Sequence, residues 1–373
     1  MLRPAIRSAL VLAASVATAL CAAFGYRAYP PAPQGVVRYA KVEVAWRVAP
    51  YGGARVTGVS LHLDGLAVPA RYDERSGAVV WRPESPLAPG RHAARCVVEF
   101  DGRYRAEKEW TFEVSPEAAV RLPDPSAEQL AAVDRVNEIR RRLGLPEFWH
   151  EPSLAAAASS HSAFLATNRA FGHAQDPAMP GFTGRTARER AMAFGYAGSV
   201  WEDVGYSARP GADLVRELFD APYHRLPFLQ PGAAPVGAGV SGPFLTLNFG
   251  SAAEAGLTVS PAPDERDVPV SWDGVETPCP LDGHGLRGPV GYPIVAAWFG
   301  EGKLELVEAR LVDSKGAEVP TVANHPGNDP HLESAVFLIP RVPLSPGERY
   351  RVLLRVRIGG KEAERDWSFA TAR

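Results

Sequence analysis

The sequence feature that most constrains the fold is an internal repeat near the two ends of the chain. A Pro-Leu-x-Pro-Gly run occupies residues 86–90 and again residues 343–347. A Trp-x-Phe element follows each run at the same distance along the sequence, at residues 110–112 and 367–369. Short apolar and β-branched runs separated by Gly, Pro and Asp turns are typical of β-sandwiches rather than of strand–helix–strand units. We therefore expect an Ig-like, all-β sandwich at each end.

The segment between the repeats has a different pattern, because apolar residues there recur at helical spacing. Ser126 and Gln129 form a capping box that begins a helix, and Gly144 followed by Pro146 ends it. Helices mixed with strands predict an α+β domain over residues 126–252. Further expected elements are helices beginning near Pro152 and near Thr186, a helix at 214–219, and strands at 236–240 and 244–249.

Proline-rich segments separate the expected domains. Residues 123–125 and 261–263 carry two prolines each, and we expect both segments to be exposed linkers. The sequence therefore predicts a multidomain chain. Its parts are a leader at 1–29, a first Ig-like sandwich at 36–115, the α+β domain at 126–252 and a second Ig-like sandwich at 258–373.

The N-terminal segment has the layout of a secretory signal. Arg3 and Arg7 precede an apolar run at 8–26 that carries no charge. The run is also long enough to cross a bilayer, which takes roughly 17–25 residues. We expect an exported protein of the cell envelope or the exterior. Cleavage of the leader and its retention as a membrane anchor are both open.

Charge and cysteine content narrow the class of protein. Lys and Arg number 40 and Asp and Glu number 42, so a net charge of −2 gives no electrostatic basis for binding nucleic acid. Cys21 lies in the leader, which leaves Cys96 and Cys279 far apart in the mature chain. Hydrophobic cores rather than a disulfide framework are expected to hold the domains together.

Two histidines near the second expected helix have different surroundings. His161 shares an apolar stripe with Leu154, Phe164 and Leu165, and a lone histidine on such a stripe is more often a hydrogen-bonded core residue than a ligand. His173 follows the end of the helix, where side chains tend to line a surface cleft. We therefore expect His161 in the core and His173 at a cleft.

The motifs of the central segment follow one another in a defined order. They lie at 136–140 with 144–146, 154–158 with 161–162, 171–173, 190–196, 201–206, 222–225, 229–231, 236–240 and 248–250. In this order and spacing they resemble the CAP superfamily of cysteine-rich secretory, venom-antigen and plant pathogenesis-related proteins, and within it the bacterial secreted branch. The resemblance covers residues 126–252, about a third of the chain.

The resemblance implies an α-β-α sandwich with a cleft lined by two histidines and two glutamates. By motif position, His173, Glu202 and His224 are three of these four residues. The second glutamate has no match, because Ala221 stands near its expected place and Glu217 is the nearest carboxylate.

Other residues are secondary candidates for the cleft. Trp201 and Asp203 flank Glu202 where the family has Gly and Asn, and they join His161 and Glu217 as secondary candidates.

Two classes of function are open for such a cleft. Flanking sandwiches favour a binding module that captures a lipid, glycan or protein ligand. The alternative is a metal-assisted hydrolase of peptidase type. No Gly-x-Ser-x-Gly nucleophile motif in strand–turn–helix context and no His-Glu-x-x-His motif supports it. Whether the protein is an enzyme is left open.

The candidate cleft residues also allow two chemical interpretations. His173, Glu202 and His224 are donors of the types that Zn²⁺ prefers, and they would leave a fourth position for water. They could equally form a hydrogen-bonded His-Glu-His cluster that fixes the shape of the cleft.

Overall fold

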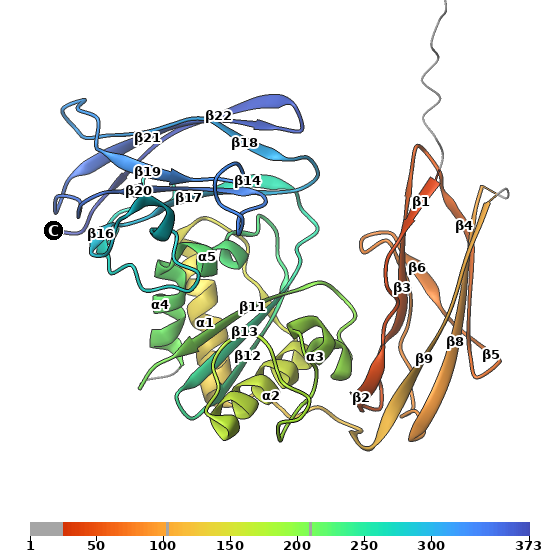
Figure 1. Ribbon diagram of the computed structural model, residues 1–373. Helices are drawn as coiled ribbons and strands as arrows, with labels where there is room; N and C mark the ends of the chain where they lie inside the picture. Colours follow the sequence, from red (N-terminus) through yellow and green to blue (C-terminus); the bar gives the residue numbers. More distant parts are fainter. Residues whose placement is uncertain (1–24, 102–103, 209–210) are drawn as a thin grey trace, which may run out of the picture.

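The computed structural model describes residues 25–101, 104–208 and 211–373 (Figure 1). Two β-sandwiches and, between them in sequence, a domain of helices packed on a sheet confirm the expected multidomain layout. Most of the leader expected at 1–29 lies outside the described residues, and its last part, Gly25–Ala28, forms the first strand of the N-terminal sandwich. In the part of the chain that the structure describes, no helix is long and apolar enough to cross a membrane.

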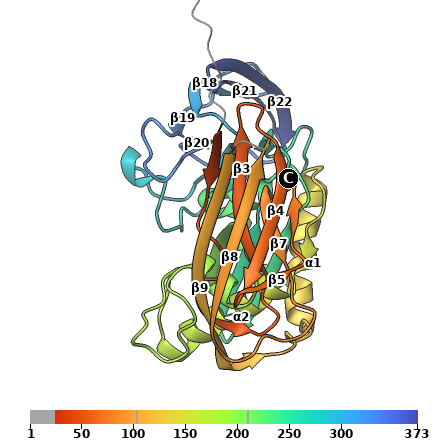
Figure 2. The same cartoon turned by 90° about the vertical axis from the view of Figure 1, so that its right-hand side faces the viewer.

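Among its described residues the N-terminal sandwich has nine strands. They are β1 (Gly25–Ala28), β2 (Gly35–Tyr39), β3 (Val44–Tyr51), β4 (Val56–Leu63), β5 (Leu66–Val68), β6 (Arg71–Asp73), β7 (Ala78–Trp81), β8 (Gly90–Phe100) and β9 (Tyr104–Ala119). One sheet has the order β1-β3-β7-β6 and the other β2-β9-β8-β4-β5, and the long strands run along the length of the sandwich (Figure 2). Their inner faces enclose a core of their own around Trp46, Phe100 and Phe112.

In the C-terminal sandwich the paired strands are antiparallel, whereas β2 and β9 of the N-terminal sandwich are parallel. The strands of the C-terminal sandwich are β14 (Gly256–Ser260), β15 (Ser271–Trp272), β16 (Val290–Gly291), β17 (Ile294–Phe299), β18 (Leu304–Val312), β19 (Thr321–Asn324), β20 (Ala335–Pro340), β21 (Arg349–Ile358) and β22 (Lys361–Ala370). The sheet β14-β17-β20-β19 packs against β18-β21-β22, and β15 pairs with β16. Both end domains are therefore all-β as expected, while the Ig-like classification stays a prediction.

The sequence repeat corresponds to the same structural unit in both sandwiches. Each copy forms a long antiparallel hairpin, β8–β9 in the first and β21–β22 in the second. Alternate side chains of a strand share a face, so the Trp and Phe of each Trp-x-Phe element point the same way. Trp110, Phe112, Trp367 and Phe369 are all buried. The repeat is thus the inward face of the last strand of each sandwich.

The central domain has helices on both faces of one sheet. Its elements are α1 (Ala127–Arg142), β10 (Trp149–His150), α2 (Pro152–Asn168), α3 (Ala187–Ala193), β11 (Val200–Tyr206), α4 (Ala212–Asp220), α5 (Pro222–Arg225), the 3₁₀ turn η1 (Leu226–Leu229), β12 (Pro235–Ser241) and β13 (Phe244–Gly250). The sheet order is β10-β12-β13-β11. The α2 and α3 helices lie on one face, and α1 and α4 lie on the other, which confirms the expected α-β-α sandwich (Figure 1).

The first helix begins as its sequence predicts. Gln129 N donates to Ser126 Oγ at 3.2 Å, and Ser126 N donates to Gln129 Oε1 at 2.7 Å, so the capping box is formed in both directions. Gly144 follows the helix with φ of 70°, a left-handed conformation that glycine adopts without strain. Residues on the inner side of α1, such as Val133, Val136 and Ile139, are buried against the sheet.

The central domain and the C-terminal sandwich share one hydrophobic core. Leu218 and Phe228 of the central domain belong to the same buried cluster as Trp272 and Phe337 of the sandwich. The prediction of an exposed linker at 261–263 is right only for Pro263, since residues 260–262 are buried and Trp367 Nε1 donates to Pro261 O at 2.9 Å. The connection between the two domains that is mostly exposed lies earlier, at 251–255.

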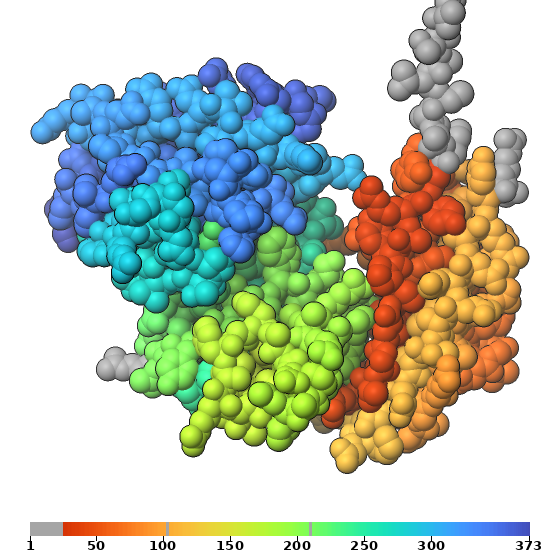
Figure 3. All heavy atoms as spheres, viewed as in Figure 1, coloured from red at the N-terminus to blue at the C-terminus, as the bar shows by residue number. Residues whose placement is uncertain are grey.

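The N-terminal sandwich is attached in a different way. It has a separate core and lies against the central domain (Figure 3). Gly195, just after α3, lies close to the side chain of Tyr39 in β2, and Arg38 donates to Phe182 O at 2.9 Å. Arg75 and Glu254 form an exposed ion pair at 3.4 Å. The contacts are mainly local and polar, in contrast to the shared core on the other side.

Candidate functional site

The candidate site lies on β11, which forms an edge of the central sheet. Successive side chains of a strand point to opposite faces, and residues paired across strands share a face. Glu202 is paired with Asn248, whose side-chain amide donates to Leu154 O on α2. Asp203 is paired with Leu247, a core residue on the α1 side. Glu202 therefore faces α2 and Asp203 faces the opposite side.

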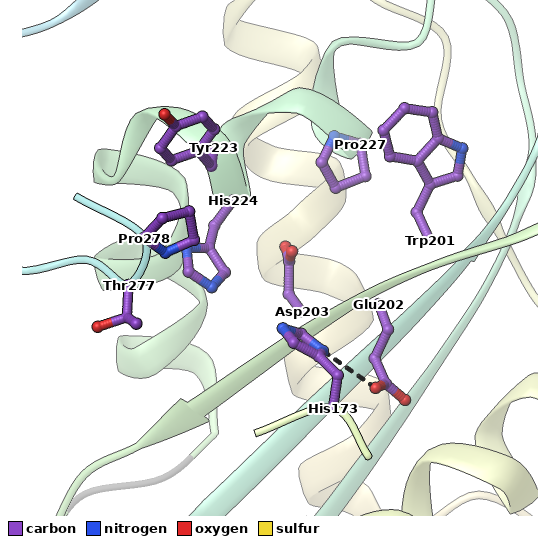
Figure 4. A pocket seen from close by; sticks show the side chains of 9 residues that line it. All are labelled: His173, Trp201, Glu202, Asp203, Tyr223, His224, Pro227, Thr277 and Pro278. Carbon is purple, nitrogen blue, oxygen red and sulfur yellow. Dashed lines mark hydrogen bonds and ion pairs between the residues drawn. The ribbon is translucent and has the colours of Figure 1, made fainter. Parts of the chain in front are cut away.

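Glu202 is buried and fully engaged. Its side chain is 3% exposed, and Arg190 Nη2 lies 2.7 and 2.6 Å from its two oxygens. His173 Nδ1 lies 3.1 Å from Oε1, the contact drawn as a dashed line in Figure 4. Burial alone would raise the pKa of this carboxyl group, but the hydrogen bond from His173 and the charge of Arg190 hold it below its usual value. Glu202 is thus ionised, with both oxygens occupied.

His161 is a satisfied core residue, as expected from its stripe. It is fully buried; Nε2 donates to Gly172 O at 2.9 Å, and Nδ1 accepts from Gln175 Nε2 at 3.1 Å. Burial lowers the pKa of His161 to about 4, so the ring is neutral. By bonding to Gly172 it fixes the loop that carries His173 into the site.

His224 is paired with a glutamate from the C-terminal sandwich. Glu276, in the loop between β15 and β16, accepts from His224 N at 2.9 Å and from its Nδ1 at 2.6 Å. Burial alone would lower the pKa of His224, but the hydrogen bond to Glu276 and the charges of Asp203 and Glu276 raise it above its usual value. The carboxylate that the motif lacks near Ala221 is therefore supplied to this histidine from another domain.

The neighbouring tyrosine is held by the same sandwich. Tyr223 Oη donates to Asp329 Oδ2 at 2.5 Å, and Asn324 Nδ2 donates to the same oxygen at 2.8 Å. Two consecutive residues of α5, Tyr223 and His224, are thus anchored to carboxylates of the C-terminal sandwich.

Unlike Glu202 and Glu276, Asp203 forms no ion pair among the described residues. It is 4% exposed, and its Oδ2 has no hydrogen-bond partner among the described residues. Burial, partly opposed by the charge of His224, raises the pKa of Asp203 to about 8. The group is therefore largely protonated at neutral pH.

These residues surround a single pocket between β11, α5 and the loop that carries Glu276 (Figure 4). Its volume is about 140 Å³. Rings and apolar side chains form much of its wall, and carboxyl and imidazole groups are the polar part. The lining residues are His173, Trp201, Glu202, Asp203, Tyr223, His224, Pro227, Thr277 and Pro278.

The structure brings most of the sequence candidates together. His173, Glu202 and His224 line the pocket, and so do the secondary candidates Trp201 and Asp203. His161 lies beneath the site, with Nε2 3.7 Å from Glu202 Oε1.

Glu217 is exposed on α4 and does not line the pocket. Sequence reasoning missed Glu276, Arg190 and Tyr223 as parts of the site. Arg190 is the first residue of the motif at 190–196, but nothing in the pattern of that motif indicates a carboxylate partner. The signal for Glu276 was indirect, namely the missing glutamate near Ala221.

The three candidate ligands differ in what their contacts leave free for a metal. Arg190 binds both oxygens of Glu202, which leaves that carboxylate poorly suited as a ligand. Glu276 occupies only Nδ1 of His224, and a carboxylate in that position also supports metal-binding histidines. Within the described ranges no three His, Cys, Asp or Glu side chains are grouped as metal ligands would be. The hydrogen-bonded interpretation agrees better with these contacts, although the expected His-Glu-His cluster is divided into two separate His–Glu pairs. Zinc binding by these residues stays a prediction.

Comparison with known proteins agrees with the architecture of the central domain. Residues 133–242 match the family model of the CAP, cysteine-rich secretory protein family. No curated protein sequence matches the chain.

Solved structures with detectable likeness are distant. One is an extracellular protein containing an SCP domain from Bacillus anthracis, with 15% identity, a TM-score of 0.31, and coverage of 67% of this chain and 100% of that one. CopC from Methylosinus trichosporium has 17% identity, a TM-score of 0.22 and coverage of 32% and 94%. PcoC, a copper resistance protein from Escherichia coli, has 21% identity, a TM-score of 0.19 and coverage of 30% and 94%.

TM-scores this low carry no argument about function. The family match, the ordered motifs and the α-β-α sandwich together lead to one conclusion: the central domain of this chain is a CAP domain.

Proposed function

We propose that the protein is an exported binding protein whose CAP-domain pocket captures one ring of an envelope or extracellular glycan. The observation that carries this proposal is the size and lining of the pocket, a volume of about 140 Å³ with flat apolar walls and a polar floor. Export is supported by the arginine-flanked apolar run at 8–26.

The volume selects among the ligand classes that the sequence left open. A cavity of about 150 Å³ holds one benzene molecule. The pocket therefore accepts one six-membered ring, whereas a sterol or an acyl chain would extend far outside it. A glycan fits this limit because it can present one residue at a time while the rest of the chain stays in solvent.

The chemistry of the wall matches that of a sugar ring. A pyranose has apolar C–H faces and a rim of polar groups, so it needs flat apolar surfaces and hydrogen-bonding groups in one site. The rings of Trp201 and Pro227 stand on one side of the pocket and those of Tyr223 and Pro278 on the other, with Asp203 and the histidines between them (Figure 4). Pockets with apolar walls and a few placed polar groups are the general form of small-ligand sites.

The contacts of Glu202 favour a structural role for this carboxylate over proton transfer to a substrate. A general acid or base must be free to exchange a proton with the substrate. Both oxygens of Glu202 are engaged by Arg190, and His173 binds one of them as well; Glu276 fixes the orientation of His224. These pairs define a rigid pocket wall, and preorganised walls lower the cost of binding.

The test is calorimetric titration of the full chain with mono- and oligosaccharides from envelope glycans. Trp201→Ala removes one flat wall and is expected to weaken binding about tenfold. Trp149→Ala is the matched control, because Trp149 is 46% exposed, close to the 42% of Trp201, and does not line the pocket. A sugar that binds equally to wild type and Trp201→Ala contradicts the proposal. So does binding of a fatty acid or sterol that Trp201→Ala abolishes, if no sugar binds.

A further inference from the structure

Among the carboxyl groups at the pocket, Asp203 has no positively charged side chain in the described part of the chain as its own ion-pair partner. The pocket and the groups behind it contain two buried cation–carboxylate pairs, Arg190 with Glu202 and His224 with Glu276. Each cation is thus already matched by one glutamate. Asp203 lies between these pairs, is 4% exposed and has an Oδ2 with no hydrogen-bond partner among the described residues.

The remaining titratable groups do not change this balance. His173 bonds to Glu202 from the exposed side, with its side chain 55% exposed. His161 is buried behind Glu202 and is neutral. A buried carboxyl group without a partner is costly in its charged form, so it either keeps its proton or meets a cation.

We propose that Asp203 makes the pocket select a ligand ring that carries a primary ammonium group, as an amino sugar with a free amine does. The ring part of this inference rests on the proposed function, whereas the ammonium part rests on Asp203 itself. A ligand ammonium group at Oδ2 would supply both the missing hydrogen bond and the missing charge.

The charges around the pocket favour a cation over an anion. With both glutamates matched, the ionised form of Asp203 would carry the one uncompensated charge on the α5 side of β11, and a ligand ammonium group beside its unpartnered Oδ2 would balance that charge. An anionic ligand could not balance it in a partly desolvated site. The half-exposed indole of Trp201 adds an aromatic face, which attracts cations rather than anions.

The test compares rings that differ only in the amine. Glucosamine, N-acetylglucosamine and glucose are titrated into the full chain at pH 7, and cyclohexylamine and cyclohexanol form a second pair without sugar hydroxyls. We expect glucosamine to bind about tenfold or more tightly than the two neutral sugars, because a hydrogen bond to a charged group is worth at least that much. Asp203→Asn keeps the shape of the side chain and removes its charge, and it is expected to abolish the preference. Glu217→Gln, an exposed carboxylate outside the pocket, is expected to leave it unchanged.

The outcomes separate this inference from the proposed function. If cyclohexylamine binds wild type but not Asp203→Asn while no sugar binds, the ammonium site stands and the glycan proposal fails. If all three sugars bind equally and Asp203→Asn changes nothing, the glycan proposal stands and the inference is overturned. Thermal unfolding of Asp203→Asn close to that of wild type shows that the variant is folded, so a lost preference then reports on the pocket.

Discussion

His224 stands between two carboxyl groups that reach it from different directions. Glu276 accepts a hydrogen bond from Nδ1, and Asp203 in its ionised form would also favour the protonated imidazole. The side chain of Glu276 is fully buried and that of His224 is 16% exposed, so solvent screens the pair little. The pair therefore contributes to the stability of the fold wherever the imidazole is protonated.

Glu276→Gln is expected to destabilise the protein in a pH-dependent way. The pKa of His224 is raised in the folded state, so the pair stabilises the fold fully below the unfolded value of about 6.5 and loses this contribution as the pH rises through the folded pKa. We expect a loss of about 1–3 kcal/mol at pH 5.5 and a smaller loss at pH 9. Urea unfolding of both proteins at the two pH values measures it, and an equal loss at both would contradict the raised pKa.

For individual site residues, the sequence predicted those that lie in the ordered motifs of the central domain and missed a residue that another domain supplies. His173, Glu202 and His224 were found because each belongs to a motif of the central domain. Glu276 is 52 residues from His224 and lies in a loop of another domain. No local periodicity or spacing encodes a contact of that kind, because it depends on how two domains pack.

The strand β12 shows how one element sets the spacing of two layers. Its sequence Val-Gly-Ala-Gly-Val places Val236 and Ala238 in the core on the α1 side and turns Gly237 and Gly239 toward α2. A Cβ atom on Gly239 would overlap the backbone of Ala158 and Ser159. The absence of side chains at these two positions lets α2 lie directly on the sheet, which positions the loop that carries His173.

Gly239→Ala is therefore expected to push α2 away from the sheet. The overlap is with main-chain atoms that cannot rotate aside, so we expect a cost of about 3 kcal/mol or more and a lower melting temperature. Gly283→Ala is the control, because a Cβ atom there meets nothing within 4 Å. Thermal unfolding followed by circular dichroism compares the two variants, and equal melting temperatures would refute the close approach.

Elements with strong local signals were predicted well. The capping box at Ser126 and the hairpins of the repeat are encoded by neighbouring residues, and all of them form. The burial of residues 261 and 262 was not predicted, because two prolines show that a segment is irregular but not that it is exposed. Packing against Trp367 decides its burial.

Across the whole molecule the three domains form two units: the N-terminal sandwich alone, and the central domain together with the C-terminal sandwich. The central domain and the C-terminal sandwich share a core and jointly build the pocket, whereas the N-terminal sandwich keeps its own core. Continuous burial of apolar surface stabilises far more than a few exposed polar contacts do. The first pair should therefore behave as one folding unit.

Limited proteolysis is expected to give two stable fragments rather than three. Trypsin should cut first after Arg121, whose side chain is 77% exposed just beyond β9, and release the N-terminal sandwich from residues 122–373. A glutamate-specific protease should also cut the exposed connection at Glu254. We expect the two halves of that nicked unit to elute together in size-exclusion chromatography. Separate elution of the C-terminal sandwich would contradict the shared core.

The unequal attachment of the domains also determines how the molecule would respond to tension. A pull between residue 25 and a ligand held in the pocket passes through the N-terminal sandwich and the segment at 120–126 before it reaches the central domain and the C-terminal sandwich, which build the pocket together. The joint at Arg38 and Arg75 would separate before the shared core deforms, because a few polar contacts resist force less than a buried apolar seam. The segment at 120–126 would then extend, while the pocket keeps its shape and its bound ligand.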